Sequence, residues 1–229
     1  MDSILAILAH PDDEVFISGT LSLAVRDGLK VNVVYVTSGD AGTDKSGRRL
    51  KGEKLARERE IEVRSALREI GLIDQPYLLR FPDGKTSECL DEIKAKIREI
   101  FFRLKPSIVI SFGPDGITGH KDHINTGIIT TTVFGETGIG EKLYWPVLPE
   151  SMRDLLGEEG YSLNFVADRR ITTRVDISRA LGEKIRALSH HRTQFSEDEV
   201  AILSRIFSSH AEEDFILAMS AGRRETILW

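Results

Sequence analysis

The sequence predicts a single-domain α/β fold of the Rossmann-like type, with three layers (αβα) and a mainly parallel sheet. A chain of 229 residues suits one substantial hydrophobic core and is short for two. Short apolar segments alternate with longer amphipathic ones, and this alternation implies right-handed βαβ units. No linker, internal repeat or low-complexity run divides the chain. We therefore expect one domain over residues 1–229.

Strands and helices are expected to alternate through the first half of the chain. Residues 31–37 (VNVVYVT) are β-branched and aromatic with little polar alternation, as in a strand that is buried on both faces. A long charged helix should end at Gly71, and a later one should close before Pro106. The expected elements are a strand at 3–9, a helix at 14–27, a strand at 31–37, a helix at 49–70, a short strand at 76–80, a helix at 87–104 and a strand at 107–112.

The second half of the chain has weaker patterns. Segments 142–148 and 161–167 suit strands or loops, and ITTRVDIS at 171–178 suits an edge strand. Helices are expected at 178–191 and 196–207.

Composition narrows the class of protein. The formal net charge of −5 and the lack of a basic run argue against non-specific binding to nucleic acid or to an anionic membrane surface. The apolar stretch near the N-terminus is short and runs into acids, so it suits neither a signal peptide nor a membrane span. A single cysteine, Cys89, allows no intramolecular disulfide. We expect a cytoplasmic protein.

Polar clusters follow three of the expected strands. The first strand runs into His10-Pro11-Asp12-Asp13-Glu14, the second into Ser38-Gly39-Asp40, and the strand at 107–112 is followed by Gly119-His120-Lys121-Asp122-His123. In open α/β sheets, ligands bind beyond the carboxyl ends of the strands. We therefore expect these clusters to gather at one edge of the sheet.

The first and last clusters carry the residue types of a catalytic metal site. Together they supply three histidines and three aspartates: His10, Asp12, Asp13, His120, Asp122 and His123. Nitrogen and carboxylate ligands suit zinc or a similar divalent ion with an open position for water. The positive charge of such an ion would offset the negative charges of the three adjacent carboxylates from Asp12 to Glu14.

Geometry alone leaves the roles open. Adjacent residues of an extended segment point apart, so one of Asp12 and Asp13 can bind a metal while the other faces the bound water. His120 and His123 permit the same division between a ligand and a catalytic group. The cluster therefore suits metal-assisted hydrolysis of an amide.

Three other interpretations suit parts of this pattern. Asp12 or Asp13 could simply cap the following helix. The chain could be a Rossmann-like nucleotide- or small-molecule-binding protein without hydrolytic activity, but it has no G-x-G-x-x-G and no P-loop lysine. A phosphoryl-transfer enzyme that uses magnesium is disfavoured by the histidines, because magnesium prefers oxygen ligands.

With these residues in view, the sequence resembles the PIG-L/LmbE-like deacetylases. AHPDDE at 9–14 paired with GHKDH at 119–123 carries the resemblance, and TSGDAG, FPDG and HRTQ support it. The resemblance implies a metal-dependent N-deacetylase that acts on a small N-acetylated amino sugar or its conjugate. It also implies zinc as the cofactor, with Fe²⁺ as another possible ion, and members of the family are often homo-oligomers.

The family pattern assigns roles at the matching positions. It makes His10, Asp13 and His123 the metal ligands and Asp12 the general base. His120 would stabilise the oxyanion or protonate the leaving amine, and Asp122 would orient His120.

Several further residues have two interpretations. Arg59 matches a substrate-binding arginine of some members, or lies on a salt-bridged helix face. Asp83 and Asp40 could bind a sugar hydroxyl or belong to turns. Thr118 stands where some members carry an oxyanion-stabilising tyrosine, and His191 could reach the site or lie at a helix end. The segment 134–170 has no clear match to any subfamily and leaves the substrate open.

Overall fold

A twisted central sheet forms the middle of the molecule. The computed structural model describes residues 2–157 and 162–221. The strands lie in the order β3-β2-β1-β4-β5-β8-β7, and β6 pairs with β5. They are β1 (Ser3–Leu8), β2 (Lys30–Thr37), β3 (Tyr77–Phe81), β4 (Ile108–Ser111), β5 (Lys142–Pro149), β6 (Phe165–Val166), β7 (Thr173–Asp176) and β8 (Glu212–Ser220).

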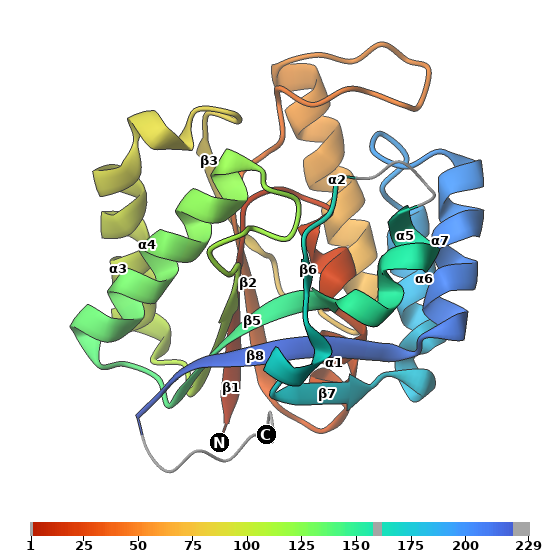
Figure 1. Cartoon of the computed structure of the whole chain (residues 1–229). Coiled ribbons are helices and arrows are strands. Elements are labelled where there is room, and N and C mark those ends of the chain that lie inside the picture. Colours follow the sequence, from red (N-terminus) through yellow and green to blue (C-terminus); the bar gives the residue numbers. More distant parts are fainter. Residues whose placement is uncertain (1, 158–161, 222–229) are drawn as a thin grey trace.

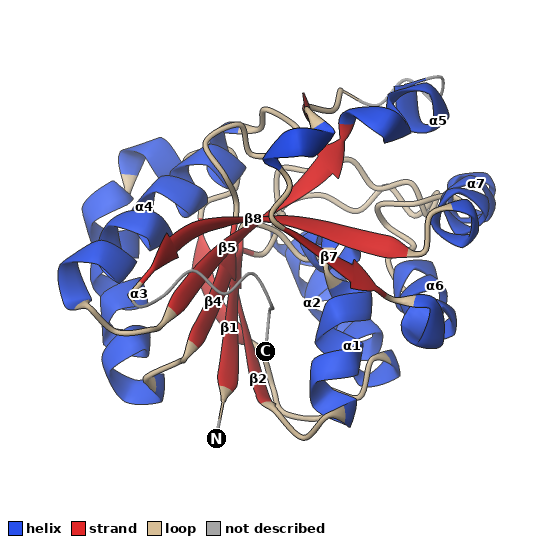
Figure 2. Cartoon of the chain, turned by 60° about the horizontal axis from the view of Figure 1, so that its bottom comes forward, coloured by secondary structure: helices blue, strands red, loops and turns tan. Residues whose placement is uncertain are grey.

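Helices cover both faces of the sheet (Figures 1 and 2). Helices α3 and α4 lie on one face, whereas α1, α2 and α6 lie on the other, with α7 packed against α6. The helices are α1 (Ser18–Arg26), α2 (Glu53–Glu69), α3 (Leu90–Leu104), α4 (Lys121–Thr137), α5 (Arg153–Gly157), α6 (Leu181–Ser189) and α7 (Glu197–Ser209). The predicted three-layer α/β fold with a mainly parallel sheet is confirmed.

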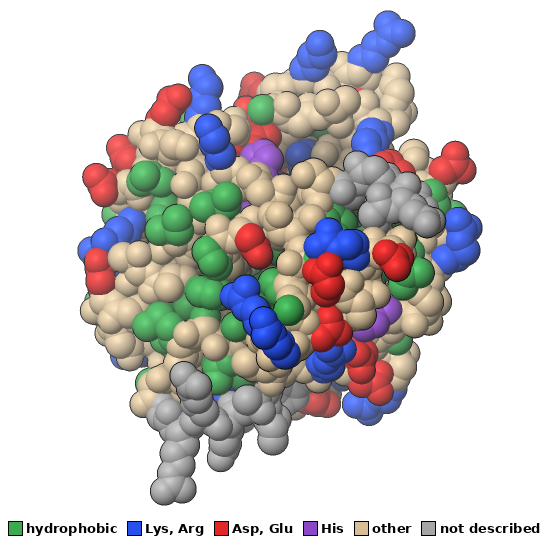
Figure 3. Space-filling model, in the orientation of Figure 1, with side chains coloured by type: hydrophobic (Ala, Val, Ile, Leu, Met, Phe, Trp, Pro, Cys, Tyr) green, Lys and Arg blue, Asp and Glu red, His purple; other side chains and the backbone are tan. Residues whose placement is uncertain are grey.

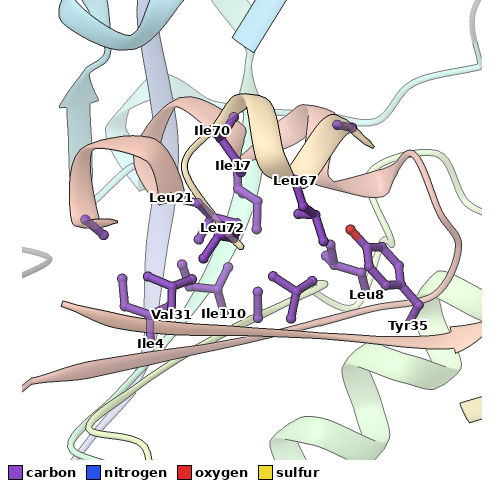
Figure 4. Packing of buried hydrophobic residues seen from close by; sticks show 14 of the residues in the cluster. Ile4, Leu8, Ile17, Leu21, Val31, Tyr35, Leu67, Ile70, Leu72 and Ile110 are labelled. Carbon is purple, nitrogen blue, oxygen red and sulfur yellow. The ribbon is translucent and has the colours of Figure 1, made fainter. Parts of the chain in front are cut away.

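The core divides into two clusters, one on each face of the sheet. Alternate side chains of a strand point to opposite faces, so Ile4 and Leu8 of β1 join one cluster while Leu5 and Ile7 join the other. Figure 4 shows the first cluster, in which strand residues such as Ile4, Val31 and Ile110 face apolar side chains of α1 and α2. Because β1 is apolar on both faces, it can occupy the centre of the sheet.

The parallel strands create a switch in strand order at β1. Strand β1 pairs in parallel with β2 on one side and with β4 on the other. The chain runs outward from β1 through β2 to β3, and then returns to β4. A crevice therefore forms beyond the carboxyl ends of β1 and β4, which is where such sheets bind ligands.

The far end of the sheet differs from the expected pattern. Residues 212–220 were not predicted as a strand, yet β8 pairs antiparallel with both β5 and β7 and lies between them. The predicted edge strand at 171–178 is β7, the last strand of the sheet. Of the expected segment 161–167 only β6 is a strand, and Tyr161 lies outside the described residues.

Most boundary differences have a local cause. The predicted helix at 14–27 is a 3₁₀ turn at Asp13–Phe16 followed by α1. The predicted helix at 49–70 begins only at Glu53, because Arg49 and Gly52 have positive φ angles of 58° and 55° and interrupt a helix there. The predicted helix at 87–104 likewise begins as a 3₁₀ turn before α3.

The charged side chains of the described residues form no basic patch on the face shown in Figure 3, in agreement with the lack of a basic run in the sequence. Acidic and basic side chains are interspersed on the face that Figure 3 shows. Within residues 2–157 and 162–221, no helix is both long enough and apolar enough to span a bilayer.

The close approach of α4 to β4 depends on Gly127. A Cβ atom at this position would lie 2.3 Å from the backbone oxygen of Phe112. We expect Gly127→Ala to lower the free energy of unfolding by about 1–3 kcal/mol, because the helix must move away from the sheet. Urea denaturation measures this effect.

Gly135→Ala on the same helix is the matched control. Its Cβ would meet only the Met219 terminal methyl group at 3.6 Å, which is an ordinary contact. Because alanine favours the helix over glycine, we expect Gly135→Ala to raise stability by about 0.5–1 kcal/mol. Equal effects of the two substitutions would contradict the packing argument.

Candidate active site

Two of the three polar clusters expected at the strand ends, those that begin at His10 and at Gly119, meet in one cavity of about 400 Å³, whereas Ser38 and Asp40 line a different one. The first cavity lies beyond the carboxyl ends of β1 and β4 and receives side chains from six separate segments. Its lining comprises His10, Asp12, Asp13, Val15, Phe16, Gly42, Arg59, Asp83, Thr118, His120, His123, Leu163, Gln194 and Phe195. We call this the catalytic cavity. Of the residues singled out from the sequence as possible site residues, Asp40, Asp122 and His191 do not line it.

Asp13 is held rigidly at the end of β1. Its Oδ2 accepts hydrogen bonds from the backbone N–H groups of Ala9 (3.0 Å) and His10 (2.7 Å). Its Oδ1 lies 3.1 Å from Nε2 of His123. Burial alone would raise the pKa of Asp13, but the facing His123 and His10 outweigh it and hold that pKa well below its ordinary value. Asp13 is therefore a preorganised carboxylate.

His123 points a ring nitrogen at Asp13 from the first turn of α4. Its Nδ1 donates to the backbone oxygen of Gly116 at 2.9 Å, which leaves the lone pair of Nε2 free in the neutral ring. That Nε2 lies 3.1 Å from Nδ1 of His10. The ring of Phe112 stacks on His123 with a centroid separation of 4.2 Å and limits its orientation.

His10 is oriented by carboxylates on its outer side. Its Nε2 lies 3.0 Å from Oδ1 of Asp83 and 3.3 Å from Oδ2 of Asp122. Asp122 is fully buried and accepts hydrogen bonds from the Gly84 N–H (2.7 Å) and the Thr86 hydroxyl (2.6 Å). These contacts turn Nδ1 of His10 towards Asp13 and His123.

The carboxylate of Asp122 therefore has a different partner from the one expected. The family pattern pairs it with His120, but it contacts His10 instead. His120 is the N-cap of α4, and its Nδ1 accepts the backbone N–H of Asp122 at 3.2 Å. The cap geometry turns the Asp122 side chain inward and leaves His120 exposed to solvent.

Asp12 adopts an unusual backbone conformation next to these groups. Its φ angle is 112°, which is rare for a residue with a side chain. The Asp12 N–H donates to Oε2 of Glu14 at 3.1 Å, and Arg59 donates to Asp12 Oδ1 at 3.0 Å and to the Pro11 carbonyl. A strained conformation of this kind persists where several surrounding contacts hold it in place, as in many active sites.

Arg59 is not on a salt-bridged helix face. It is 4% exposed and also donates from Nη1 to the Gly39 carbonyl at 3.1 Å. Gly39 has a φ of 69°, and a Cβ there would lie 2.1 Å from Arg59, so the turn after β2 must be glycine for this arginine to fit. Burial raises the pKa of Asp12, an effect that the adjacent Arg59 opposes.

Each of the three adjacent acidic side chains has a different basic partner. Asp12 pairs with Arg59, Asp13 faces His123, and Glu14 contacts the buried His191. The expectation that a bound ion would offset all three is therefore wrong for Glu14. Its carboxylate also accepts the Tyr35 hydroxyl at 2.8 Å, and His191 belongs to this support rather than to the cavity wall.

The other residues for which the sequence allowed two roles lie in or near the catalytic cavity. Asp83 uses Oδ1 for His10 and accepts the Ala41 N–H at 3.0 Å with Oδ2, while Asp40 accepts the Asp83 N–H at 3.3 Å. The Thr118 hydroxyl lies 3.2 Å from Nδ1 of His123. From segment 134–170, Leu163 lines the cavity. Gln194, the last residue of the HRTQ match, and Phe195, which no motif indicated, also line it.

The donor atoms of His10, Asp13 and His123 lie within a few tenths of an ångström of the spacing in a tetrahedral metal site. Nδ1 of His10 lies 3.7 Å from Oδ2 of Asp13, Nε2 of His123 lies 3.1 Å from the other carboxylate oxygen, Oδ1, and the two ring nitrogens are 3.1 Å apart. Ligands at 2.0–2.2 Å from a tetrahedral zinc ion are about 3.3–3.6 Å apart. Two nitrogens and a carboxylate, each held by a second contact, therefore fit a divalent ion.

Comparison with known proteins finds relatives in sequence and in fold. The chain is 30% identical to the 1D-myo-inositol 2-acetamido-2-deoxy-alpha-D-glucopyranoside deacetylase of Rhodococcus jostii, over 97% of this chain and 94% of that protein. The fold resembles N,N'-diacetylchitobiose deacetylase from Pyrococcus horikoshii, with a TM-score of 0.70, 22% identity, and coverage of 93% of this chain and 82% of that one.

A hydratase has a similar fold. The 4-carboxy-2-hydroxymuconate hydratase from Pseudomonas putida gives a TM-score of 0.69 at 17% identity and covers 98% of this chain and 99% of that one. The fold alone therefore does not decide the chemistry, and the site must. The family model described as PIG-L, GlcNAc-PI de-N-acetylase, matches residues 5–134, which include both the AHPDDE and GHKDH segments. This chain belongs to the PIG-L family of deacetylases.

Proposed function

We propose that this enzyme is a zinc-dependent hydrolase that removes an acetyl group from the amide nitrogen of an N-acetylated amino sugar or its conjugate. The observation that carries the proposal is the convergence of His10, Asp13 and His123, with donor atoms 3.1–3.7 Å apart, beside the strained Asp12. The relative from Rhodococcus jostii, whose name describes an acetylated glucosamine conjugate, supports the substrate class.

His10, Asp13 and His123 would hold the metal ion. Such an ion supplies Lewis-acid activation of water and polarisation of the amide carbonyl. Two nitrogens and one carboxylate suit zinc, and Fe²⁺ accepts the same donors. The contacts of Asp83 and Asp122 to His10 would keep its ring in the ligating orientation.

Asp12 is the general base in this proposal. Its carboxylate lines the catalytic cavity next to Asp13, so it can take a proton from water at the reaction centre. Burial raises the pKa of Asp12 and makes the carboxylate a stronger base. Arg59 holds one carboxylate oxygen and leaves the other for the proton.

His120 is suited to donate a hydrogen bond to the substrate. Its Nδ1 accepts the Asp122 N–H, so the proton of the neutral ring lies on Nε2. Its ring stands edge-on to His10 at 4.8 Å between centroids. From there, Nε2–H can stabilise the developing oxyanion, and a protonated ring can deliver a proton to the leaving amine.

Arg59 and Asp83 are proposed to contact the sugar. Both line the catalytic cavity while bonded to Asp12 and His10, respectively. A hydroxyl group that binds either residue would place the amide relative to the base and the metal ligands. Positioning of this kind contributes substantially to catalysis.

Acetate release tests the proposed function. The zinc-loaded enzyme is incubated with N-acetylglucosamine and with its inositol glycoside, and acetate and free amine are measured together. We expect equal amounts of both products, and no turnover after chelation until zinc is restored. Absence of amine from every N-acetylated sugar offered to the zinc-loaded enzyme would refute the proposal.

The nucleotide-binding alternative is less well supported. Asp12 and Asp13 lie where a phosphate would need backbone N–H groups or a cation, and magnesium-dependent phosphoryl transfer is disfavoured by the histidine donors. Calorimetry with metal-free enzyme and nucleotides separates these functions, because the hydrolase is expected to give no binding heat.

Asp122→Asn should weaken metal binding by about 10–100-fold, because the charged partner of His10 is lost. Competition with a chromophoric chelator measures the change in affinity. Asp91→Asn, an exposed position on α3, is the control and should leave the affinity unchanged. Unchanged affinity in Asp122→Asn would mean that Asp83 alone orients His10.

A further inference from the structure

A second cavity of about 120 Å³ adjoins the catalytic cavity. Leu148, Met152, Leu156, Leu203 and Phe207 lie on its walls, and we call it the apolar cavity. These side chains come from β5, the short helices that follow it, and α7. Protein interiors are close-packed, and an empty apolar space costs stability because its walls lose contacts. A cavity of this kind is a candidate binding site for an apolar group.

The apolar and catalytic cavities share four wall residues. Val15, Phe16, Leu163 and Phe195 line both. Val15 and Phe16 belong to the 3₁₀ turn that begins at Asp13, so the shared wall starts two residues beyond a proposed metal ligand. An apolar group attached to a molecule at the reaction centre can therefore extend along this wall into the apolar cavity.

The charged groups in the wall of the apolar cavity already have partners. Lys184 and Glu213 are 3% and 4% exposed and form an ion pair at 2.5 Å. Glu213 also accepts the Gly19 and Thr20 N–H groups at 2.9 and 2.7 Å, at the start of α1. Asp214 pairs with His210 at 3.2 Å and with Arg174 at 3.5 Å. An occupant would therefore gain chiefly by burying apolar surface.

We propose that the apolar cavity receives a saturated hydrocarbon chain of about four to six carbons carried by the N-acylated substrate. A cavity of about 150 Å³ with similar walls accommodates benzene, which sets the scale for 120 Å³. The inference rests on the proposed function and narrows its substrate class to amphiphilic amides. The chain can be attached at the acyl carbon or at the anomeric oxygen, since either can face the shared wall.

Two substrate series distinguish the points of attachment. The first is N-acetyl-, N-butyryl- and N-hexanoylglucosamine, and the second is methyl, butyl and hexyl N-acetylglucosaminide. In the series whose chain enters the apolar cavity, we expect kcat/KM to rise about fourfold for each added methylene up to the longest member. Calorimetry on the same compounds measures the Kd without requiring turnover.

Substitutions that fill the apolar cavity test its part in this preference. In Leu203→Trp and Met152→Phe, the ratio of kcat/KM between the longest and shortest chains should fall at least tenfold. Both residues line the apolar cavity and neither lines the catalytic one. Leu90→Trp, at an exposed leucine of α3, is the matched control and should keep the wild-type ratio. Met152→Phe adds less volume and provides the test if Leu203→Trp does not fold.

The outcomes separate the inference from the proposed function. Turnover of acetylated sugars without chain-length dependence in either series overturns the inference and keeps the function. A Kd that tightens with chain length, with no turnover of any amide, overturns the function and keeps the apolar site. A chain-length preference that persists in both cavity-filling variants also overturns the inference.

Discussion

Asp12→Asn should lower kcat about 10²–10⁴-fold while the enzyme keeps its metal. Asparagine preserves the size of the side chain and an oxygen for the Arg59 contact, but its amide cannot accept a proton from water. Because the proposed ligands His10, Asp13 and His123 are unchanged, the metal content should stay at about one ion per chain. The loss should appear in kcat, since Asp12 acts on the reacting water rather than on substrate affinity.

Acetate release and metal content are measured on the same preparation of Asp12→Asn. Asp168→Asn serves as the control, because this acid lies on the surface and pairs with Ser151 and Arg174. It should keep wild-type turnover. Full turnover in Asp12→Asn would assign proton abstraction to another group, whereas loss of metal would make Asp12 a ligand instead of a base.

His10→Ala and His123→Ala should each abolish metal binding and, with it, turnover. Each substitution removes one of three donors, so the affinity should fall by more than the 10–100-fold typical of changing a ligand's hydrogen-bond partner. Mass spectrometry of metal content should give about one divalent ion per wild-type chain and almost none in either variant. Near-stoichiometric metal in either would remove that residue from the ligand set.

His120→Ala distinguishes two possible ligand sets. The ring nitrogens of His10, His120 and His123 also lie within 4.8 Å of one another and could bind an ion without Asp13. We expect His120→Ala to retain its metal and lose kcat, and Asp13→Asn to lose its metal. The opposite pair of results would establish the three-histidine site and leave Asp13 as its hydrogen-bonded support.

Much of the fold and the outline of the site could be predicted because they follow from the hydrophobic and polar patterns of neighbouring residues. Segments such as VNVVYVT are apolar on both faces and can be stable only in the interior of a sheet. The polar residues that follow them lie at the carboxyl ends of parallel strands, so the convergence of AHPDDE and GHKDH is a consequence of topology.

Other features depend on contacts between distant segments. Nothing local indicates that Asp122 contacts His10, 112 residues away, rather than its neighbour His120. The pairings of Asp12 with Arg59 and of Glu14 with His191 likewise join residues 47 and 177 positions apart. Strand β8 was not predicted, because its stability comes from its pairing with β5 and β7.

The sequence by itself determined the residue types at the site, the strands that carry them and the edge of the sheet at which they meet. Only the tertiary structure decided which cation faces each acid and which carboxylate orients each histidine. It also decided that an apolar cavity adjoins the reaction centre. The physical reason is that hydrophobic periodicity is a property of neighbouring residues, whereas charge pairing and cavity shape arise when distant side chains compete for the same space.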